Sequence, residues 1–470
     1  MSITEHEVGA RIDRLPIWPY RRVVLLMAGV GFFFAYFEGV NLGVALPGAL
    51  EAFGSSFAAA ATIVSIAMWG AILGTMVGGW VSDRFGRKAA ILMATLIYGI
   101  GSALTAFAPN VAMFTAMRFI AVMGGAMATI SIAAYLSELA PAGKRGRYVA
   151  VSIMPAMAGM ASVPFIGLAI IPFFDNGWRL VLLVPVLGTI IFLTGYRFLP
   201  ESPRWLVAHG RGEEAREIVE KSEAYVRSRI PGELAAPEPD VAADRAAATS
   251  GGGTWAELLR PPHRRWVLLF AIIWFGIQIP VKSVLGLGVT LLTERGFDIT
   301  TSITLTIGQS VGVVVGAGVA FMVSDRWARK YSAMAMTIGC GVVVLLMAFF
   351  PTNALIVLAF AGIGMFIGLS APLLYLLTAE HFPTRIRNRG CAIPQTIGDF
   401  GGVAGPYVAL GAFALGGFSG TFIVLGVIFM LLAVPLALTR NTTGANLEEL
   451  AERKEVEPRT EPASGAPAPS

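Results

Sequence analysis

The chain has 470 residues, of which 55% are hydrophobic and 14% are charged, and its mean hydropathy is +0.70. A soluble protein of this length needs far more polar side chains to cover its surface, so most of these apolar residues are expected to face lipid. The net charge is +5, but lysine and arginine gather in short connectors rather than on a basic, aromatic-laced face. We therefore expect a lipid bilayer and no nucleic-acid partner.

Apolar runs long enough to cross a bilayer, about 20 residues each, occur in twelve places. The expected spans are 23–46, 60–81, 89–108, 111–135, 148–172, 178–199, 266–292, 303–323, 331–350, 354–379, 390–415 and 418–438. This pattern predicts an all-α integral membrane protein.

The basic residues predict the orientation. Of 35 lysines and arginines, only Arg179 and Arg295 fall in connectors expected outside, while Arg118 and Lys282 lie inside apolar runs. The others lie in the N-terminus, the even-numbered connectors and the C-terminus. Because cytoplasmic connectors carry the positive charge, both termini are expected in the cytoplasm and the chain in the cell (inner) membrane.

Five regions follow from this reading: a cytoplasmic N-terminus (1–22), a six-helix half (23–199), a cytoplasmic linker (200–265), a second six-helix half (266–439) and a disordered tail (440–470). The first 22 residues carry acids and bases, which argues against a cleaved signal peptide. Residues 212–221 predict an amphipathic surface helix, and the Ala-, Pro- and Gly-rich stretch up to 251–253 predicts a flexible linker.

A connector motif occurs twice at one spacing. GWVSDRFGRK at 79–88 is repeated as SDRWARK at 324–330, and Ser324 follows Ser82 by 242 residues. Glu380 follows Glu138 by the same 242 residues. A shared offset indicates a duplicated half-molecule, as in membrane transporters built from two repeats.

The motif at 79–88 closely resembles the signature of the major facilitator superfamily. The matching residues are Gly79, Asp83, Arg84, Gly86, Arg87 and Lys88. Within that superfamily the chain resembles the sugar porter and metabolite:proton symporter branch, through residues 200–206 (PESPRWL), Glu138 with Arg145-Gly146, and residues 380–383 (EHFP). The resemblance implies twelve transmembrane helices in two six-helix repeats and a functional monomer.

Departures from the sugar porter pattern bear on the substrate. Sugar porters carry paired glutamines in helix 7 and Pro-Trp in helix 10, whereas this chain reads WFGIQIPVK at 274–282 and APLLY at 371–375. The first span, EGVNLGVALP at 38–47, is closer to symporters for organic and aromatic acids, which carry Asp where this chain has Glu38.

The charged connectors predict a gate. Asp83 ends the second span, where its carboxylate can cap the third span and meet Arg or Lys across the loop. The resemblance implies contacts that hold the cytoplasmic side closed and break when the halves rock. The simpler alternative is that the basic residues only keep these connectors in the cytoplasm. The residues assigned to the gate are Asp83, Arg84, Gly86, Arg87, Glu138, Arg145, Asp325, Arg326, Glu380 and Arg387, with Glu138 expected near Arg145 and Glu380 near Arg387.

Glu38 is the leading candidate for a proton carrier. A carboxylate within an apolar run is costly and so predicts a function, and the four histidines all lie in the tail or connectors. Related symporters pair a helix 1 acid with a helix 4 arginine, which implies Arg118 as the partner. A static ion pair, or a Glu38 solvated near the outer surface, remains an alternative.

Lys282 follows Gln278 by four residues, so both project from one face of the seventh span. Pro280 between them is expected to break the helix and open carbonyls to a cavity. Lys282 needs an anion, either Asp399 or a substrate carboxylate, and the sequence leaves both open.

Other polar residues are weaker candidates. Asn41, Gln309 and Gln395 are expected either to line the cavity or to join helices by hydrogen bonds, and Tyr375 to line the cavity. The pattern G-x-S-x-G at 308–312 lies inside an apolar run, so it predicts close helix packing rather than a nucleophile. Cys340 and Cys391 are read as small apolar residues, since their spacing fits neither a metal site nor a disulfide framework.

We therefore expect a proton-coupled importer of a small organic solute, most consistent with a carboxylate, that is not an enzyme. Glu38 and Arg118 are assigned to proton coupling, and the residues assigned to the substrate are Lys282, Gln278, Asn41, Tyr375 and Asp399. No ATP-binding loop is present, so no cofactor is expected and the proton gradient supplies the energy. The alternatives are a sugar or polyol symporter or facilitator, a drug or metabolite:proton antiporter, and a non-transporting sensor on this fold.

Overall fold

The computed structural model describes residues 4–230, 234–235, 255–261, 263–323, 329–383 and 386–441. Within these ranges all regular structure is helical, and eleven helices are long and apolar enough to span a membrane. The last, Arg387–Ala437, is interrupted at Gly416 and Gly417, where φ of Gly417 is 58°. Glycine adopts this conformation freely because it has no Cβ. The interruption divides the segment into two spans. The predicted all-α class and twelve spans are confirmed.

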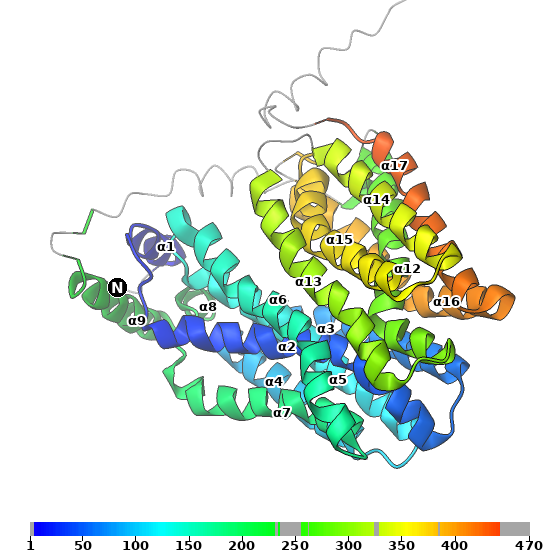
Figure 1. Cartoon of the computed structure of the whole chain (residues 1–470). Coiled ribbons are helices and arrows are strands. Elements are labelled where there is room, and N and C mark those ends of the chain that lie inside the picture. The colour runs from blue at the N-terminus through cyan, green and yellow to red at the C-terminus, as the bar shows by residue number, and fades with distance from the viewer. Residues whose placement is uncertain are drawn as a thin grey trace, which may run out of the picture.

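The helices form two bundles. Those of the N-terminal half are α2 (Arg22–Phe53), α3 (Phe57–Phe85), α4 (Arg87–Ala106), α5 (Val111–Leu139), α6 (Arg145–Ile170) and α7 (Gly177–Gly195). Those of the C-terminal half are α12 (His263–Glu294), α13 (Ile299–Val323), α14 (Arg329–Phe349), α15 (Asn353–Ala379), α16 (Arg387–Leu431) and α17 (Ala433–Ala437). The bundles join toward one end and diverge toward the other (Figure 1). We call the diverging end, which carries the connectors after α3, α5, α13 and α15, the basic end, and the opposite one the far end.

Two helices continue through proline. The first span, expected to end near Leu46, continues through Pro47 to Phe53. A break was expected at Pro280, but α12 runs continuously from His263 to Glu294. In each helix proline removes one backbone donor, and packing against neighbouring helices outweighs that loss.

Glycines bring helix backbones into direct contact in both halves. A Cβ atom placed on any of four glycines would lie 2.1–2.4 Å from a carbonyl oxygen of the neighbouring helix, closer than real Cβ atoms come. The four contacts are Gly70 with Phe119, Gly74 with Met123, Gly312 with Ala361, and Gly316 with Met365. Each residue of the second half follows its counterpart by 242 residues, so α3 packs on α5 as α13 packs on α15. This confirms the duplication, and Gly312 confirms the packing role predicted for 308–312.

The two halves touch near the far end. A Cβ at Gly43 on α2 would lie 2.2 Å from the carbonyl oxygen of Leu285 on α12. The Ser65 hydroxyl donates to the carbonyl of Val403 at 2.9 Å, while the rings of Phe57 and Phe413 lie 4.6 Å apart. These contacts join α2 and α3 to α12 and α16 on the side away from the basic end.

A small helical unit covers the basic end of the N-terminal half. It consists of α1 (Glu5–Asp13), α8 (Pro203–Ala208) and α9 (Gly212–Arg227). The apolar side chains that join them are Val8, Ile12, Trp205, Leu206, Ala215 and Val219. The surface helix predicted at 212–221 is confirmed as α9, whereas α1 and α8 were not predicted. The stretch 251–253 and the tail beyond 441 lie outside the described residues.

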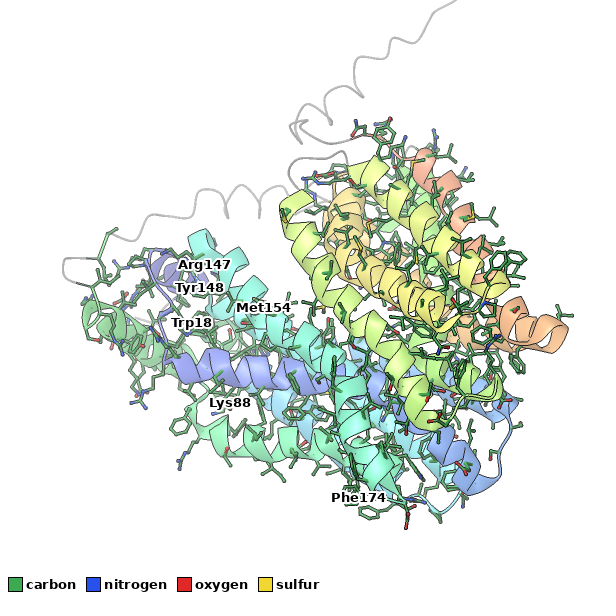
Figure 2. All side chains as sticks on the ribbon, in the orientation of Figure 1. Trp18, Lys88, Arg147, Tyr148, Met154 and Phe174 are labelled. Atoms are coloured by element: carbon green, nitrogen blue, oxygen red, sulfur yellow. The ribbon has the colours of Figure 1, made fainter. Side chains whose placement is uncertain are left out.

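Figure 2 shows Trp18, which follows α1, beside Tyr148 at the basic end of α6. Their ring centroids are 5.1 Å apart, and the Trp18 amide donates to the Tyr148 hydroxyl at 2.8 Å. Asp13 accepts from the amide of Ala142 and pairs with Arg204 at 3.0 Å. The N-terminal segment is thus tied to both the α5–α6 connector and the linker.

Glu223 is the charged centre of this unit. Its carboxylate receives Arg11 through two bonds of 2.9 and 3.0 Å and Arg14 at 2.7 Å. Burial raises the pKa of Glu223, but the hydrogen bonds and charges of Arg11 and Arg14 outweigh it, so the pKa lies below its usual value. The ionised form of Glu223 therefore stabilises the docking of α1.

Substituting Gly312 with Ala is expected to lower the free energy of unfolding by about 1–3 kcal/mol, because the added methyl group overlaps the carbonyl of Ala361. Gly318→Ala on the same helix is the matched control, since nothing lies within 4 Å of its Cβ position. Thermal unfolding in detergent would measure both. Equal midpoints for the two variants would contradict close packing of α13 on α15.

Docking of α1 is expected to depend on pH. Because the folded-state pKa of Glu223 is lowered, its stabilisation is complete above the unfolded value of about 4.3 and is lost as pH falls through the folded value. Hydrogen exchange of residues 5–13 should therefore be faster in Glu223→Gln than in wild type at pH 7. The difference should shrink as pH falls below the unfolded value and vanish below the folded-state pKa of Glu223. The exposed Glu220→Gln serves as control. A difference that persists at low pH would show that charge does not hold α1.

Candidate functional site

A sealed ion pair lies within the N-terminal half. Arg118 on α5 places Nη1 2.7 Å from Oε1 of Glu38 on α2, and both side chains are 0% exposed. Arg118 Nη2 donates to the backbone carbonyl of Glu38 and to Oδ1 of Asn41 at 2.8 Å. The predicted partner of Glu38 is thus the observed one, and Glu38 is not solvated in this conformation.

The two oxygens of Glu38 differ in their surroundings. Oε2 accepts from the Ser102 hydroxyl at 2.8 Å and from Asn41 Nδ2 at 3.2 Å. Oε1 is 2.7 Å from Arg118 Nη1 and forms the ion pair. Gly125 on α5 faces the stem of Glu38, and a Cβ there would lie 3.6 Å from its Cγ, an ordinary contact distance. Ser102 was not predicted, because a single serine in an apolar run carries no distinguishing signal.

Asn41 belongs to this network. Its side chain is fully buried and bonds to both members of the ion pair. The hydrogen-bonding alternative for Asn41 therefore describes its position here, and its predicted contact with substrate is not available in this conformation.

Lys282 and Asp399 form a second, more open pair of charges. Gln278 Nε2 on α12 donates to Oδ1 of Asp399 on α16 at 3.3 Å. Asp399 is the acidic group that acts electrostatically on Lys282, but no ion pair within 4.0 Å joins them. Both residues are partly exposed. Of the two alternatives for Lys282, a close ion pair with Asp399 is not formed in this conformation.

Glycines on α16 bring these charges together. A Cβ at Gly401 or Gly405 would strike a carbonyl oxygen of α12 at 2.2 or 2.6 Å, and one at Gly402 would lie 3.1 Å from Cγ of Lys282. The lysine stem therefore lies along the glycine face. The spacing of these glycines in the sequence is a signal that could have placed α16 against α12.

An aromatic surface lies beside Asp399. Tyr375 on α15 is 43% exposed, and its ring meets Trp274 of α12 edge to face at 5.0 Å. Gln395 donates to the Tyr375 hydroxyl. The titratable neighbours of Tyr375 include Asp399 and, from the other half, Tyr36. That Tyr375 lines the transport cavity stays a prediction, and Trp274 was not singled out from the sequence.

Gln309 lies elsewhere. It lines a small cavity between α2, α6, α12 and α13 together with Thr306 and Ser310. The cavity measures about 40 Å³, far below the roughly 300–1,000 Å³ of small-molecule pockets. Gln309 is therefore not grouped with Lys282 and Asp399.

The connector motifs form one ion pair in each half. Arg87 pairs with Glu138 at 2.7 Å, and Arg329 pairs with Glu380. Both members of the second pair follow those of the first by 242 residues. The contacts expected for Glu138 with Arg145 and for Glu380 with Arg387 stay predictions, since the Arg145 side chain lies outside the described residues. The guanidinium of Arg387 donates to the Phe382 carbonyl at 3.4 Å.

The start of α4 is capped by a residue that was not assigned a role. Glu201 Oε1 accepts from the amides of Arg87 and Lys88 at 2.9 and 3.1 Å. Gly86 has φ of 97°, and a Cβ there would lie 2.4 Å from Glu201 Oε2, which explains the glycine. Capping by Asp83 was therefore wrong, although Asp83 does meet Arg87 at 2.7 Å as expected.

Only some of the remaining residues predicted to form the gate lie within the described ranges. Arg84 is exposed at the basic end, while Asp325 and Arg326 lie outside the described residues. The ion pairs seen for Asp83, Glu138 and Glu380 each join residues of one half. A role in closing the two halves stays a prediction.

Cys391 is not packed like Cys340. Cys340 on α14 is 5% exposed, whereas Cys391 on α16 is partly exposed and has Arg387 and Tyr375 as neighbours. Both cysteines are free thiols, and Cys391 is the more accessible of the two.

A membrane-impermeant maleimide is expected to label Cys391 and to spare the buried Cys340. If the basic end is cytoplasmic, labelling should occur in inside-out vesicles and be weak in right-side-out ones. Cys391→Ser should abolish labelling, whereas the control Cys340→Ser should leave it unchanged; gel shift or mass spectrometry measures both. Labelling confined to right-side-out vesicles would reverse the predicted orientation.

Comparison with known proteins identifies the family to which this chain is similar. The sequence model of the family described as "Sugar (and other) transporter" matches residues 27–453. The niacin transporter NiaP of Acinetobacter baylyi is 26% identical over 94% of this chain and 99% of its own. The organic cation transporter protein of Drosophila melanogaster is 31% identical over 74% of this chain and 63% of its own.

Among solved structures, the xylose transporter XylE from E. coli in an inward-open conformation superposes with a TM-score of 0.71. It is 21% identical, covering 92% of this chain and 99% of XylE, so this likeness concerns the fold. The family match spans both six-helix halves. The chain therefore belongs to the sugar (and other) transporter family of the major facilitator superfamily, and is a multi-pass membrane transporter rather than an enzyme.

Proposed function

We propose that this protein imports a small organic carboxylate together with a proton by alternating access. The observation that carries the proposal is the sealed ion pair of Glu38 and Arg118, 2.7 Å apart and 0% exposed. A buried ion pair is expensive and is weak evidence for stability alone. A role that needs both charges, the binding and release of a proton, gives a reason for that cost.

In the proposed cycle Glu38 takes the proton and Arg118 senses its charge. Protonation removes the negative charge that Arg118 faces, while Ser102 and Asn41 continue to bond to the carboxyl group. The guanidinium then lacks its counter-ion and a different arrangement of α2 and α5 becomes favoured. Because the pair is sealed here, proton exchange requires another conformation of the transporter.

A direct path links this pair to Lys282. Glu38 and Gly43 share α2, and Gly43 touches the carbonyl of Leu285, three residues beyond Lys282 on α12. Because the two backbones are in direct contact, a displacement of α2 displaces α12 without first being absorbed by rearranged side chains. A change of charge at Glu38 is therefore positioned to move Lys282.

The substrate carboxylate is assigned to Lys282. Its ammonium group is near Asp399 but not paired with it, and it makes no hydrogen bond to the described residues. An ammonium group at membrane depth needs an anion, which a carboxylate supplies. The proton gradient supplies the energy, and no cofactor is required.

A sugar or polyol is the second candidate. Gln278, Gln395 and Tyr375 place amide and hydroxyl groups around Asp399, as an uncharged polyhydroxyl solute requires. The family match and the XylE fold favour this reading as well.

Uptake into vesicles containing the purified protein tests both. An inward gradient of about one pH unit should drive about tenfold accumulation of benzoate-like or short organic acids per proton carried. Glu38→Gln should reduce accumulation to the level seen without a gradient, because the side chain no longer titrates. Glu38→Asp should retain it.

Glu51→Gln is the matched control, since Glu51 is an exposed carboxylate on the same helix. Gradient-driven accumulation that survives Glu38→Gln would remove Glu38 from coupling. Accumulation of hexoses or polyols that survives Lys282→Ala would establish the second candidate instead.

A further inference from the structure

The Lys282–Asp399 pair differs from the other buried pair of charges. Glu38 and Arg118 are in contact at 2.7 Å and fully enclosed. Lys282 and Asp399 act on each other electrostatically, are partly exposed, and lie too far apart for an ion pair within 4.0 Å. The members of the first pair are each other's counter-ions, whereas the second leaves a partly exposed cation and anion that do not form a close ion pair.

The positions of both charges are defined. The stem of Lys282 lies along Gly402 of α16, and Asp399 is held by Gln278, one helical turn before Lys282. Both helices are in backbone contact at Gly401 and Gly405, which limits how far the two charges can move relative to each other. The helix packing therefore fixes the backbone positions from which the two charged side chains extend.

A charge balance follows from this arrangement. Lys282 and Asp399 together are neutral. A simple carboxylate bound at Lys282 would leave Asp399 as an excess negative charge at membrane depth, and a simple cation at Asp399 would leave Lys282 unbalanced. A molecule with one carboxylate and one cationic group can meet both and keep the site neutral.

An aromatic surface borders the same place. Tyr375 has Asp399 as a neighbour, is 43% exposed, and rests edge-on against Trp274. A flat ring can stack on the exposed part of Tyr375, and a cationic nitrogen in that ring gains further from the aromatic face.

We infer that the substrate is a small zwitterion on a flat ring, with its carboxylate at Lys282 and its cationic nitrogen at Asp399. This inference rests on the proposed function, because it names the substrate class of the same site. It makes Asp399 a specificity-determining residue rather than a structural partner of Lys282.

Three probes of one shape test it: N-methylpyridinium-3-carboxylate, benzoate and N-methylpyridinium. Equilibrium binding to the purified full chain is measured without a proton gradient. Wild type should bind the zwitterion about 30-fold or more tightly than either singly charged probe, because leaving one member of a buried charge pair without its partner has about that effect.

Each single variant should remove the preference for the zwitterion over one of the two singly charged probes. Asp399→Asn should weaken the zwitterion about 30-fold and remove its advantage over benzoate, and Lys282→Gln should remove its advantage over N-methylpyridinium. The double variant K282Q/D399N keeps the site neutral, which protects against misfolding, and should not discriminate among the probes. Arg295→Gln, which removes a positive charge at the far end, should behave as wild type.

Equal affinity of wild type for benzoate and the zwitterion, unchanged zwitterion affinity in Asp399→Asn, or retained preference in the double variant would overturn the inference. Zwitterion preference without gradient-driven uptake would contradict the proton coupling alone. Gradient-driven uptake of benzoate by a chain that does not prefer the zwitterion would contradict this inference alone.

Discussion

Direct contact between helix backbones is the constraint on which the structure depends. Gly70 and Gly74 seat α3 on the carbonyls of α5, and Gly312 and Gly316 do the same for α13 and α15. Helices in lipid gain little from burying apolar surface, so close approach through small residues is a main source of their cohesion. It holds α3 against α5 and α13 against α15 within their own halves, so the motion proposed for transport would occur between the halves.

The duplication distinguishes charged residues that occur in both halves from charged residues that occur in only one. The Arg87–Glu138 pair recurs 242 residues later as Arg329–Glu380. Glu38 and Arg118 have no such counterparts: the positions 242 residues later are Pro280 and Phe360. Residues shared by the halves hold each bundle at the basic end, and charges that occur once lie at membrane depth.

The same asymmetry holds in the other half. The positions 242 residues before Lys282 and Asp399 are Val40 and Met157. Each half thus carries one pair of intramembrane charges that the other lacks. The enclosed pair is on the N-terminal side and the accessible pair on the C-terminal side, and the contact of Gly43 with Leu285 lies between them. The proposed proton chemistry and the proposed solute binding would then lie in different halves that touch.

The sequence by itself determined the spans and the duplication, and it singled out Glu38, Arg118, Lys282 and Asp399 as candidates. The reason is that lipid penalises polar groups so strongly that apolar runs and the charges within them are conspicuous. Only the tertiary structure decided which groups meet. Ser102 beside Glu38, Glu201 at the start of α4 and Glu223 beneath α1 all depend on distant segments coming together. The separation of Lys282 from Asp399 depends likewise on how closely α12 and α16 approach, which side-chain packing sets and residue type alone does not encode.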